Sequence, residues 1–456
     1  MSNKQLFVPA GKSPPPATHD EAGGSAYSFS PEHALAQYAI TGTFHGTFYA
    51  TDKEQLDRVA TLSSAVSLEL VAKTAIYCRE NGRMKDMPAF LVAHLAARDV
   101  ASMLRVFPRV IDDGKMLRSF VQIVRSGVTG RKSFGSAPKR ALRAWFASRS
   151  PDVIFRQSIG QSPSMSDVIK MVRPPPRNDK GEADAVREAL YGYLIGKNID
   201  DDKLPVLPRA YEAWKRGTGP IPDVPFEMLT ALPLSAANWK ELARRMTMAQ
   251  LRMNLSTLLR HGVFDDPATV ADVAARLEDA DAVRRARVMP YQLLAAYRHV
   301  DKGVPDAIKN AIARALEHSV ANVPELGGRV VLCPDVSGSM QSPVTGHRGT
   351  ATTKVRCVDV AALVTAAILR RNPGASVIPF SDDEEWSRLR GRNPKAKLIL
   401  IDVQPSGTTQ DAGDGKRDDV LNVGGFSDAV FDVISAFTRG DLAGDTWLRA
   451  IESISL

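Results

Sequence analysis

Apolar residues recur at helical spacing through most of the chain, from about Ser30 to Pro324. In successive segments they fall at positions i, i+3, i+4 and i+7, so each segment carries one apolar stripe on an otherwise polar helix. Gly, Asn or Pro separates the segments, and strand-like alternation is nearly absent from the sequence here. Many short amphipathic helices with short connections predict a stacked array of helical hairpins. Because no strict sequence period is visible, an irregular globular α-domain stays open as the alternative.

The pattern changes after Gly328. Short apolar runs at residues 329–333, 375–380 and 397–402 predict three strands. Helical spacing follows the first run, in VRCVDVAALVTAAILRRN, and the third run, at residues 426–437. Continuously apolar strands that alternate with helices are typical of an open parallel α/β sheet. The fold class is therefore expected to be multidomain, an α-helical array followed by an α/β domain. Residues 1–27 are rich in Pro, Gly, Ser and Ala, which predicts a flexible N-terminal arm.

A polar loop follows the first predicted strand of the α/β domain. Asp335, Ser337 and Ser339 alternate along it, so three oxygen-bearing side chains can project into one crevice at the carboxyl end of the sheet. One carboxylate and two hydroxyls are hard ligands that suit Mg²⁺, with water completing its shell. The alternative is a strand-to-helix turn whose hydroxyls only cap the next helix. A serine nucleophile is disfavoured because the G-x-S-x-G elbow is missing from the sequence.

Composition limits the class of protein. With 44% hydrophobic and 24% charged residues, the chain is neither wholly disordered nor collagen-like nor a coiled coil. Three cysteines, none in C-x-x-C spacing, cannot form a disulfide framework and favour a reducing compartment. No apolar run approaches the roughly 18–20 residues of a membrane span, and the N-terminus lacks the apolar core of a signal peptide. We therefore expect a cytoplasmic protein with no membrane partner.

Charge is distributed unevenly along the chain. The net charge is +8, yet twelve basic residues lie between Lys115 and Arg173 against two acidic ones, Asp152 and Asp167. This segment therefore carries +10 and leaves −2 for the rest of the chain. Such local density predicts a surface for a polyanion, with contacts made mainly to phosphate and hence sensitive to salt. A solvated cationic face without a ligand is the alternative.

The densest part of this segment is a polar loop that runs into a helix near Ser136. Ser136 and the backbone N–H groups after it can receive a phosphate at the start of the helix. Lys139, Arg140 and Arg143 follow at spacings that place Arg143 on the same helix face as each of the other two. Composition alone does not separate RNA from DNA as the polyanion.

Several longer motifs carry a resemblance that extends over nearly the whole chain. They are SGVTGRKSFGSAPKRALRAWF, SDVIKMVRPPP, DVPFEMLTALPL, NLSTLLRHGVF, MPYQLLAAY, CPDVSGSM, SPVTG and VDVAALVTAAILR. With these motifs the sequence resembles the bacterial Ro proteins, the family of the sixty-kilodalton Ro autoantigen.

The resemblance implies a fold and a function. It implies a TROVE module over residues 28–325, built as a ring of HEAT-like helical repeats, and a von Willebrand factor A-like domain over residues 326–456 that closes the ring. It also implies a monomeric ribonucleoprotein component that binds noncoding Y-like RNA and the ends of misfolded or structured RNA. Bacterial members of the family act with a 3′ exoribonuclease in RNA quality control or processing.

The resemblance also assigns site residues. The RNA-contacting residues that it implies are Arg131, Lys132, Lys139, Arg140, Arg143, Lys170 and Arg173. The residues that it implies for a metal-ion-dependent adhesion site (MIDAS), with Mg²⁺ as the cofactor, are Asp335, Ser337, Ser339 and Asp382.

One departure from the family pattern concerns this metal site. The family's adhesion site has a Thr in a G-G-T context on a second loop, and that segment has no counterpart here. Ser381 follows Phe380 at once, which indicates an internal deletion at this junction and leaves the position of Asp382 undetermined. Thr350, Thr352 and Thr353 are poor replacements for the missing ligand. We expect a shortened domain with weakened metal binding and aggregation-prone sheet edges.

These observations together predict an RNA-binding protein without catalytic activity. The first alternative is a protein-interaction module in which the site at Asp335 recruits an acidic ligand. The second is a metal-dependent enzyme with Asp335 and Asp382 as ligands, which is disfavoured because the sequence offers no paired His or Glu constellation beside them.

Overall fold

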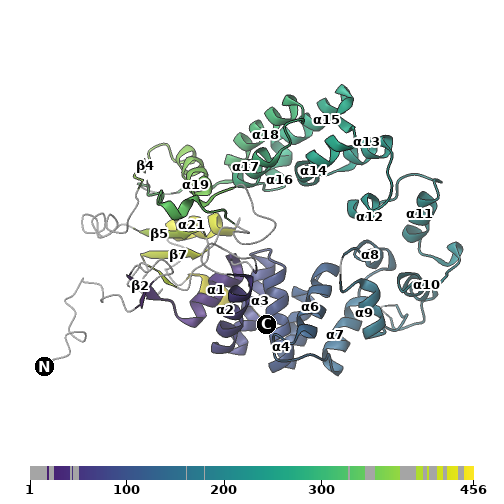
Figure 1. Ribbon diagram of the computed structural model, residues 1–456. Helices are drawn as coiled ribbons and strands as arrows, with labels where there is room; N and C mark the ends of the chain where they lie inside the picture. Colours follow the sequence, from purple (N-terminus) through teal and green to yellow (C-terminus); the bar gives the residue numbers. More distant parts are fainter. Residues whose placement is uncertain are drawn as a thin grey trace. The chain divides into compact units, whose positions relative to one another are not determined.

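The structure is a computed structural model and is mostly helical (Figure 1). It describes residues 18–19, 25–41, 44, 51–160, 162–178, 180–326, 329–344, 355–379, 397–403, 408–409, 419–424, 429–439 and 446–456. The contacts divide the chain into two compact units. The first unit comprises Met1–Val59 and Ser235–Ala450, and the second comprises Ala60–Leu234 and Ile451–Leu456.

The second unit consists of helices that pack on their neighbours along the sequence. Helices α3, α4, α5 and α6 pack on one another in this way. Their buried faces carry large apolar side chains, and the rings of Phe107 and Phe120 meet edge to face at 5.2 Å. The helices of this unit are α2 (Asp52–Ala65, which begins in the first unit), α3 (Leu68–Glu80), α4 (Asp86–Arg98), α5 (Val100–Val110), α6 (Gly114–Ser126), α7 (Ser136–Ala147), α8 (Pro151–Arg156), α9 (Met165–Val172), α10 (Ala185–Leu194), η2 (Asp201–Lys203), α11 (Val206–Lys215) and α12 (Phe226–Thr230).

The first unit combines a second set of helices with short strands. Met289, Val323, Ala367, Ile368 and Phe431 form a buried cluster that joins the helical part to α19 and α21. The helices of this unit are α1 (Pro31–Thr41), α13 (Ala236–Arg245), α14 (Met248–Arg260), η3 (Val263–Asp265), α15 (Pro267–Glu278), α16 (Ala280–Arg285), α17 (Pro290–His299), α18 (Asp306–Ser319), η4 (Val320–Asn322), η5 (Gly338–Gln341), α19 (Cys357–Arg371), α21 (Ala429–Arg439) and α22 (Thr446–Glu452, which ends in the second unit).

The strands of the first unit include two parallel pairs, as the apolar runs after Gly328 predict. Strand β3 (Val331–Leu332) pairs with β4 (Ser376–Val377), and β5 (Leu398–Asp402) pairs with β7 (Val420–Gly424). Helices α19 and α21 follow β3 and β7 along the chain, which is the alternation of an α/β domain. Strand β7 was not predicted, because Asn422 interrupts its apolar run.

The predicted N-terminal arm stays a prediction as a whole, but its described residues contain short strands. Within its described residues, β1 (Thr18–His19) pairs with β2 (Ser25–Ser28), and β2 pairs in turn with β6 (Thr408–Thr409). Helix α1 then packs against β7, and Gln37 Nε2 donates to the Asn422 carbonyl at 3.3 Å. The Pro- and Gly-rich composition concealed this because the partner strand lies far along the chain and leaves no local signal.

The predicted domain boundary at residue 326 lies inside the first unit, where α17 packs on α19. It stays a prediction, as does the deletion near residues 380 and 381, because Phe380, Ser381 and Asp382 lie outside the described residues. Among the helices that the structure describes, none is both long and apolar enough to cross a membrane.

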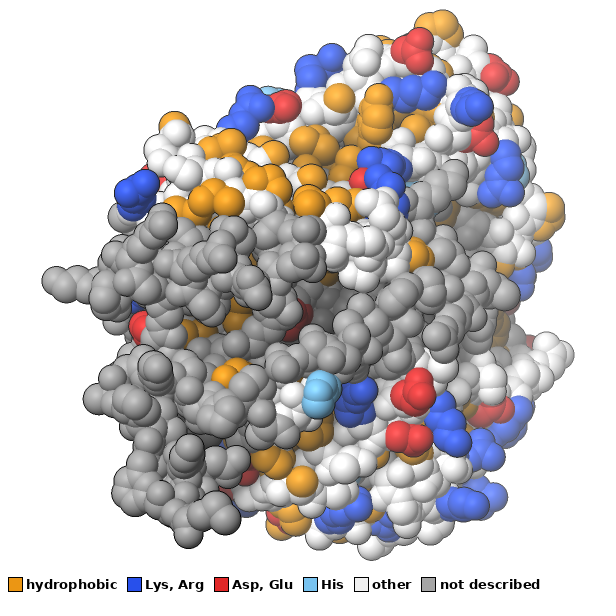
Figure 2. Space-filling view, turned by 60° about the vertical axis from the view of Figure 1, so that its left-hand side comes forward, with side chains coloured by type: hydrophobic (Ala, Val, Ile, Leu, Met, Phe, Trp, Pro, Cys, Tyr) orange, Lys and Arg blue, Asp and Glu red, His pale blue; other side chains and the backbone are white. Residues whose placement is uncertain are grey.

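The β3–β4 pair leaves apolar side chains uncovered. Val331, Val377 and Ile378 are each between 37% and 39% exposed, although parallel sheets ordinarily bury both faces. Apolar side chains also gather in the upper half of the face drawn in Figure 2.

Candidate functional site

The loop before α7 is shaped by one arginine and one glycine. Arg131 donates from Nε to the Ser133 carbonyl at 2.6 Å and from Nη2 to the Phe134 carbonyl at 2.8 Å. It also donates from Nη1 to the carbonyl of Ala96, the last-turn residue of α4, at 2.6 Å. Gly135 has φ +60°, and a Cβ added there would lie 2.3 Å from Arg131 Nη2. Arg131 therefore holds the loop through three of its guanidinium nitrogens, and the RNA contact that the family resemblance implies for it stays a prediction.

The start of α7 is open. Its N-cap is Gly135, which offers no side chain to the first-turn N–H groups. Lys132 and Arg140 beside it are exposed, and Lys139 is half-buried. The positive end of the helix dipole and these three cations therefore all favour an anion at the start of α7.

Helix α9 joins this surface to a second group of cations. Arg143 on α7 donates from Nε to the carbonyl of Val172, the last residue of α9, at 2.9 Å. Lys170 lies in the last turn of α9, and Arg173 follows it with a left-handed backbone at φ +50°. Both are exposed. The structure therefore brings together the two basic groups that the sequence singled out. We call the set Lys132, Lys139, Arg140, Arg143, Lys170 and Arg173 the α7–α9 cationic surface.

The two acidic residues of the segment do not neutralise this surface. Asp167 accepts hydrogen bonds from the hydroxyl and backbone N–H of Ser164 in the capping box of α9, and these bonds lower the pKa of its carboxyl group. Asp152 accepts from the Leu207 N–H at 3.1 Å. Within the described ranges of the chain, no carboxylate lies within ion-pair distance of the α7–α9 cationic surface.

Other basic residues of the segment have partners that the sequence did not reveal. Arg118 is 9% exposed and donates to the Gln157 carbonyl at 2.8 Å, and Arg156 forms an ion pair with Asp223. Arg149 also donates to carbonyls. Not all twelve basic residues of the segment are therefore available to bind a polyanion. Burial, a partner carbonyl or an ion pair occupies some of them, and composition does not reveal which.

The α7–α9 cationic surface can attract an extended polyanion. It offers guanidinium and ammonium donors, together with free backbone N–H groups at a helix start, all suited to phosphate oxygens. The surface as defined consists of lysines and arginines and includes no His, Cys, Asp or Glu side chain. Its chemistry is binding through charge.

The Asp335 loop forms a smaller polar cluster after β3. The Ser337 N–H donates to Asp335 Oδ1 at 2.8 Å, and the Ser337 and Ser339 hydroxyl oxygens lie 3.1 Å apart. These oxygens fit a hard cation in type, although only one of them belongs to a carboxylate. Across the described part of the chain, no group of three or more His, Cys, Asp or Glu side chains could hold a metal ion. The fourth predicted ligand, Asp382, lies outside the described residues.

Comparison with known proteins gives consistent matches. A family model described as the TROVE domain matches residues 94–324. The chain is 24% identical over 540 residues to the RNA-binding protein RO60 of Deinococcus radiodurans, an alignment that covers 93% of this chain and 95% of that protein. It is also similar to the crystal structure of the Deinococcus radiodurans RO (RSR) protein, with a TM-score of 0.60, 21% identity, and coverage of 91% of this chain and 100% of that chain.

The family match extends over more than half of the chain, so the chain belongs to the TROVE domain family. Its likeness along most of its length to the curated Deinococcus relative and to the solved Deinococcus RO structure confirms the resemblance to the bacterial Ro proteins. The curated relative is named for RNA binding and not for catalysis, in agreement with the prediction that the chain is not an enzyme.

The alignment to the curated relative extends over 540 residues, more than the 456 residues of this chain. The relative therefore contains segments that stand opposite gaps in this chain.

Proposed function

We propose that this protein binds RNA through the α7–α9 cationic surface. The observation that carries the proposal is that six cations lie on α7, on or next to α9 and on the preceding loop, with Arg143 of α7 bonded to the end of α9 and no described carboxylate paired to any of the six. The family and the name of the curated relative support RNA over other polyanions. The contacts are to phosphate, so the surface recognises the backbone and overall shape of the RNA.

The finer function follows from the family resemblance. We propose a cytoplasmic ribonucleoprotein component, monomeric in its protein part, that binds a noncoding Y-like RNA and the ends of misfolded or structured RNA. A 3′ exoribonuclease is the proposed protein partner in RNA quality control or processing. Recovery of the bound RNA and its protein companions from the host by crosslinking tests each of these statements.

Charge reversal tests the proposed surface. The double variant Lys139→Glu, Arg140→Glu places two carboxylates where two phosphate ligands stood, and we expect RNA affinity to fall by at least about 100-fold at moderate salt. The measurement is a titration of labelled stem–loop RNA with a single-stranded 3′ extension. The matched control is Arg209→Glu, Lys302→Glu, which makes the same change in net charge at two other exposed positions. Equal affinities for wild type and the Lys139, Arg140 variant would refute the proposal.

Salt gives a second readout of the same contacts. The logarithm of the binding constant should fall linearly with the logarithm of salt concentration, with a slope near −0.7 to −0.9 for each phosphate contacted. For the six cations we expect a slope of about −4 to −5. A slope near zero would show that charge does not hold the RNA.

We further propose that the α/β part of the first unit is a von Willebrand factor A-like domain whose Asp335 loop binds Mg²⁺ weakly. The contacts among Asp335, Ser337 and Ser339 support this second proposal. A bound cation with an open position would accept a carboxylate from a partner, the protein-interaction alternative. If the proposal holds, Mg²⁺ raises the melting temperature of the wild type and leaves that of Asp335→Ala unchanged. The same shift in both proteins would place the ion elsewhere.

A further inference from the structure

The C-terminal end of α7 is held by two arginines. Arg149 Nη1 donates to the Trp145 carbonyl at 3.1 Å, and Arg187 Nη1 donates to the Phe146 carbonyl at 2.7 Å. The last carbonyls of a helix have no partner within the helix and form the negative end of its dipole. Two guanidinium groups at this end satisfy the carbonyls and stabilise the dipole together.

Arg187 comes from α10 and is only 4% exposed. Its Nη2 donates to the Arg149 carbonyl at 2.9 Å, and its Nε donates to Asp184 at 3.3 Å. The Phe146 ring also meets Tyr191 of α10 edge to face at 5.8 Å. Helix α10 therefore fixes the end of α7 through one buried guanidinium and one ring contact.

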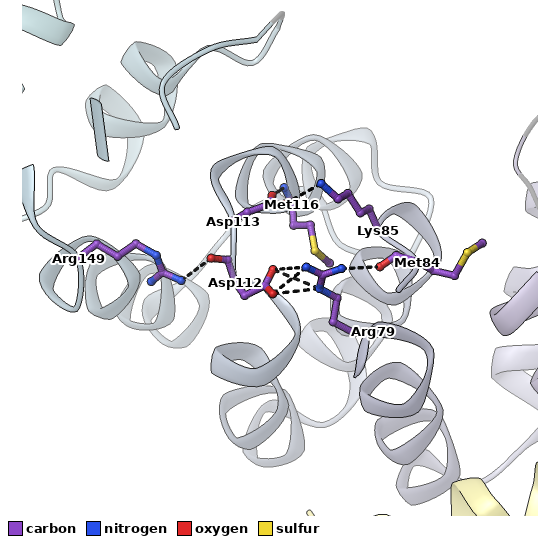
Figure 3. A network of polar contacts seen from close by, with 7 residues as sticks. All are labelled: Arg79, Met84, Lys85, Asp112, Asp113, Met116 and Arg149. Atoms are coloured by element: carbon purple, nitrogen blue, oxygen red, sulfur yellow. Dashed lines mark hydrogen bonds and ion pairs between the residues drawn. The ribbon is translucent and has the colours of Figure 1, made fainter. Parts of the chain in front are cut away.

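Arg149 continues the connection toward α3. Its Nη2 donates to the Asp112 carbonyl at 2.8 Å, and its guanidinium lies 4.0 Å from the centroid of the Trp145 ring. The Asp112 carboxylate in turn forms a bidentate ion pair with Arg79 of α3, and the shortest of its hydrogen bonds measures 2.7 Å (Figure 3). Hydrogen bonds of Arg79, Arg149 and Arg187 thus connect α3 to α10 through the C-terminal end of α7.

The two ends of α7 are treated differently. Arg149 and Arg187 bond directly to carbonyls of the C-terminal end. At the N-terminal end Arg131 ties the preceding loop to α4, but the helix itself has no side-chain cap and carries Lys139 and Arg140. The distance along the helix from Phe146 to Lys139 is about 10 Å, so a tilt of about 10° at the fastened end moves Lys139 by about 2 Å. Binding sites tolerate displacements of about 0.5 Å.

We propose that Arg187 and Arg149 are positioning residues of the α7–α9 cationic surface: they set the direction of α7 and thereby the place of Lys139 and Arg140. This inference rests on the proposed RNA-binding function and deepens it. Neither arginine touches RNA in this account, because their donors are occupied by carbonyls inside the second unit.

The variant Arg187→Lys tests the inference. Lysine keeps the positive charge but cannot reach both carbonyls with one planar group. We expect RNA affinity to fall about tenfold, and the salt slope to become about one to two units shallower, because the contacts of Lys139 and Arg140 are lost. Both measurements are made below the melting temperature of each variant, so a loss of stability alone does not alter them.

A matched control exists in the first unit. Arg276 of α15 donates to the carbonyls of Ala243 and Met246 at the end of α13, an equivalent fastening away from the α7–α9 cationic surface. Arg276→Lys should lower the melting temperature and leave the RNA affinity and salt slope unchanged. If Arg187→Lys is too unstable to purify, Arg149→Lys is the second test. It keeps the positive charge near the Trp145 ring, and we expect the same loss of RNA affinity and of salt slope.

The outcomes separate the inference from the proposed function. If Lys139→Glu, Arg140→Glu abolishes binding while Arg187→Lys and Arg149→Lys change only the melting temperature, the arginines are structural and the inference is wrong. If none of these variants alters RNA affinity, the proposed function falls and the inference falls with it. A shallower salt slope in the Arg187 and Arg149 variants, absent from Arg276→Lys, supports the inference.

Discussion

Two neighbouring residues with the same charge, Arg131 and Lys132, have different roles. Arg131 gives Nε, Nη1 and Nη2 to three carbonyls and holds the loop before α7. Lys132 is exposed, and its methylene chain covers Gly127, where an added Cβ would lie 2.7 Å from Lys132 Cε. The family resemblance implies RNA contact for both residues, and in sequence a basic loop residue looks the same whether its partner is a carbonyl or solvent. Only the folded chain separates them.

Gly135→Ala tests how tightly Arg131 is held. The left-handed backbone and the contact with Arg131 Nη2 should together cost about 2–3 kcal/mol of unfolding free energy. Gly130→Ala is the control, since Gly130 also has positive φ but open space around its Cα, and should cost only about 1 kcal/mol. Urea denaturation of the two variants makes the comparison. Equal losses would mean that Arg131 does not crowd this position.

A buried histidine predicts a pH dependence. Burial, and secondarily the positive charge of Arg98, lowers the pKa of His94 to about 4. The unfolded chain takes up this proton near pH 6.5, so below that pH it binds more protons than the folded chain. Stability should therefore fall as the pH drops from about 6.5 to about 4, by up to about 3 kcal/mol in all. Urea denaturation of wild type at pH 7.5 and pH 5 measures this.

His94→Gln supplies the control for that experiment. Glutamine cannot take up the proton, so the difference in stability between the two pH values should shrink. An undiminished difference would assign the acid sensitivity to other groups.

At the scale of elements, helices were the best predicted part. Apolar stripes with Gly or Pro between them locate the amphipathic helices of both units, because the period of 3.6 residues is a local property. Strands β2 and β7 were not predicted. Strand β2 pairs with β6, which is distant in sequence, and β7 contains the polar residue Asn422. Pairing partners decide such strands, and no local pattern encodes them.

Helix α9 offers a prediction about capping. Ser164 and Asp167 form a reciprocal capping box at its start, with Ser164 Oγ accepting from the Asp167 N–H at 3.1 Å. Ser164→Ala should cost about 1 kcal/mol and should raise the pKa of Asp167, because the hydroxyl that holds its charged form is removed. Chemical denaturation and a carboxyl NMR titration measure these effects. An unchanged Asp167 pKa would contradict the assigned cause of its shift.

At the scale of the whole molecule, the chain divides differently from the order of its sequence. Segments from both halves of the chain build the first unit, since α1 packs on β7 and β2 pairs with β6. The sequence separated an arm, a helical module and an α/β domain by changes in composition, and composition does not record which segments later fold together. Unit boundaries depend on contacts between distant segments, which local sequence patterns do not encode.

Leu35→Ala tests the cooperation between these distant segments. Leu35 of α1 is fully buried, and its truncation should cost about 2–4 kcal/mol. Hydrogen exchange should then accelerate in β7 as well as in α1, while α3 to α6 stay protected. Faster exchange confined to residues 31–41 would show that α1 is an independent element.

The bond between Gln37 and Asn422 has a consequence for synthesis. It joins residues 385 positions apart, so at about 5–20 residues per second the ribosome needs roughly 20–80 seconds to deliver the second partner after the first. The core of the second unit lies in one continuous stretch, Ala60–Leu234, and can fold within this interval. Until β7 has been synthesised, the apolar side chains of nascent α1 that pack against it stay exposed to solvent. Chaperone dependence should therefore be concentrated in the N-terminal segment, and pulse-labelled chains should acquire protease resistance in the second unit first.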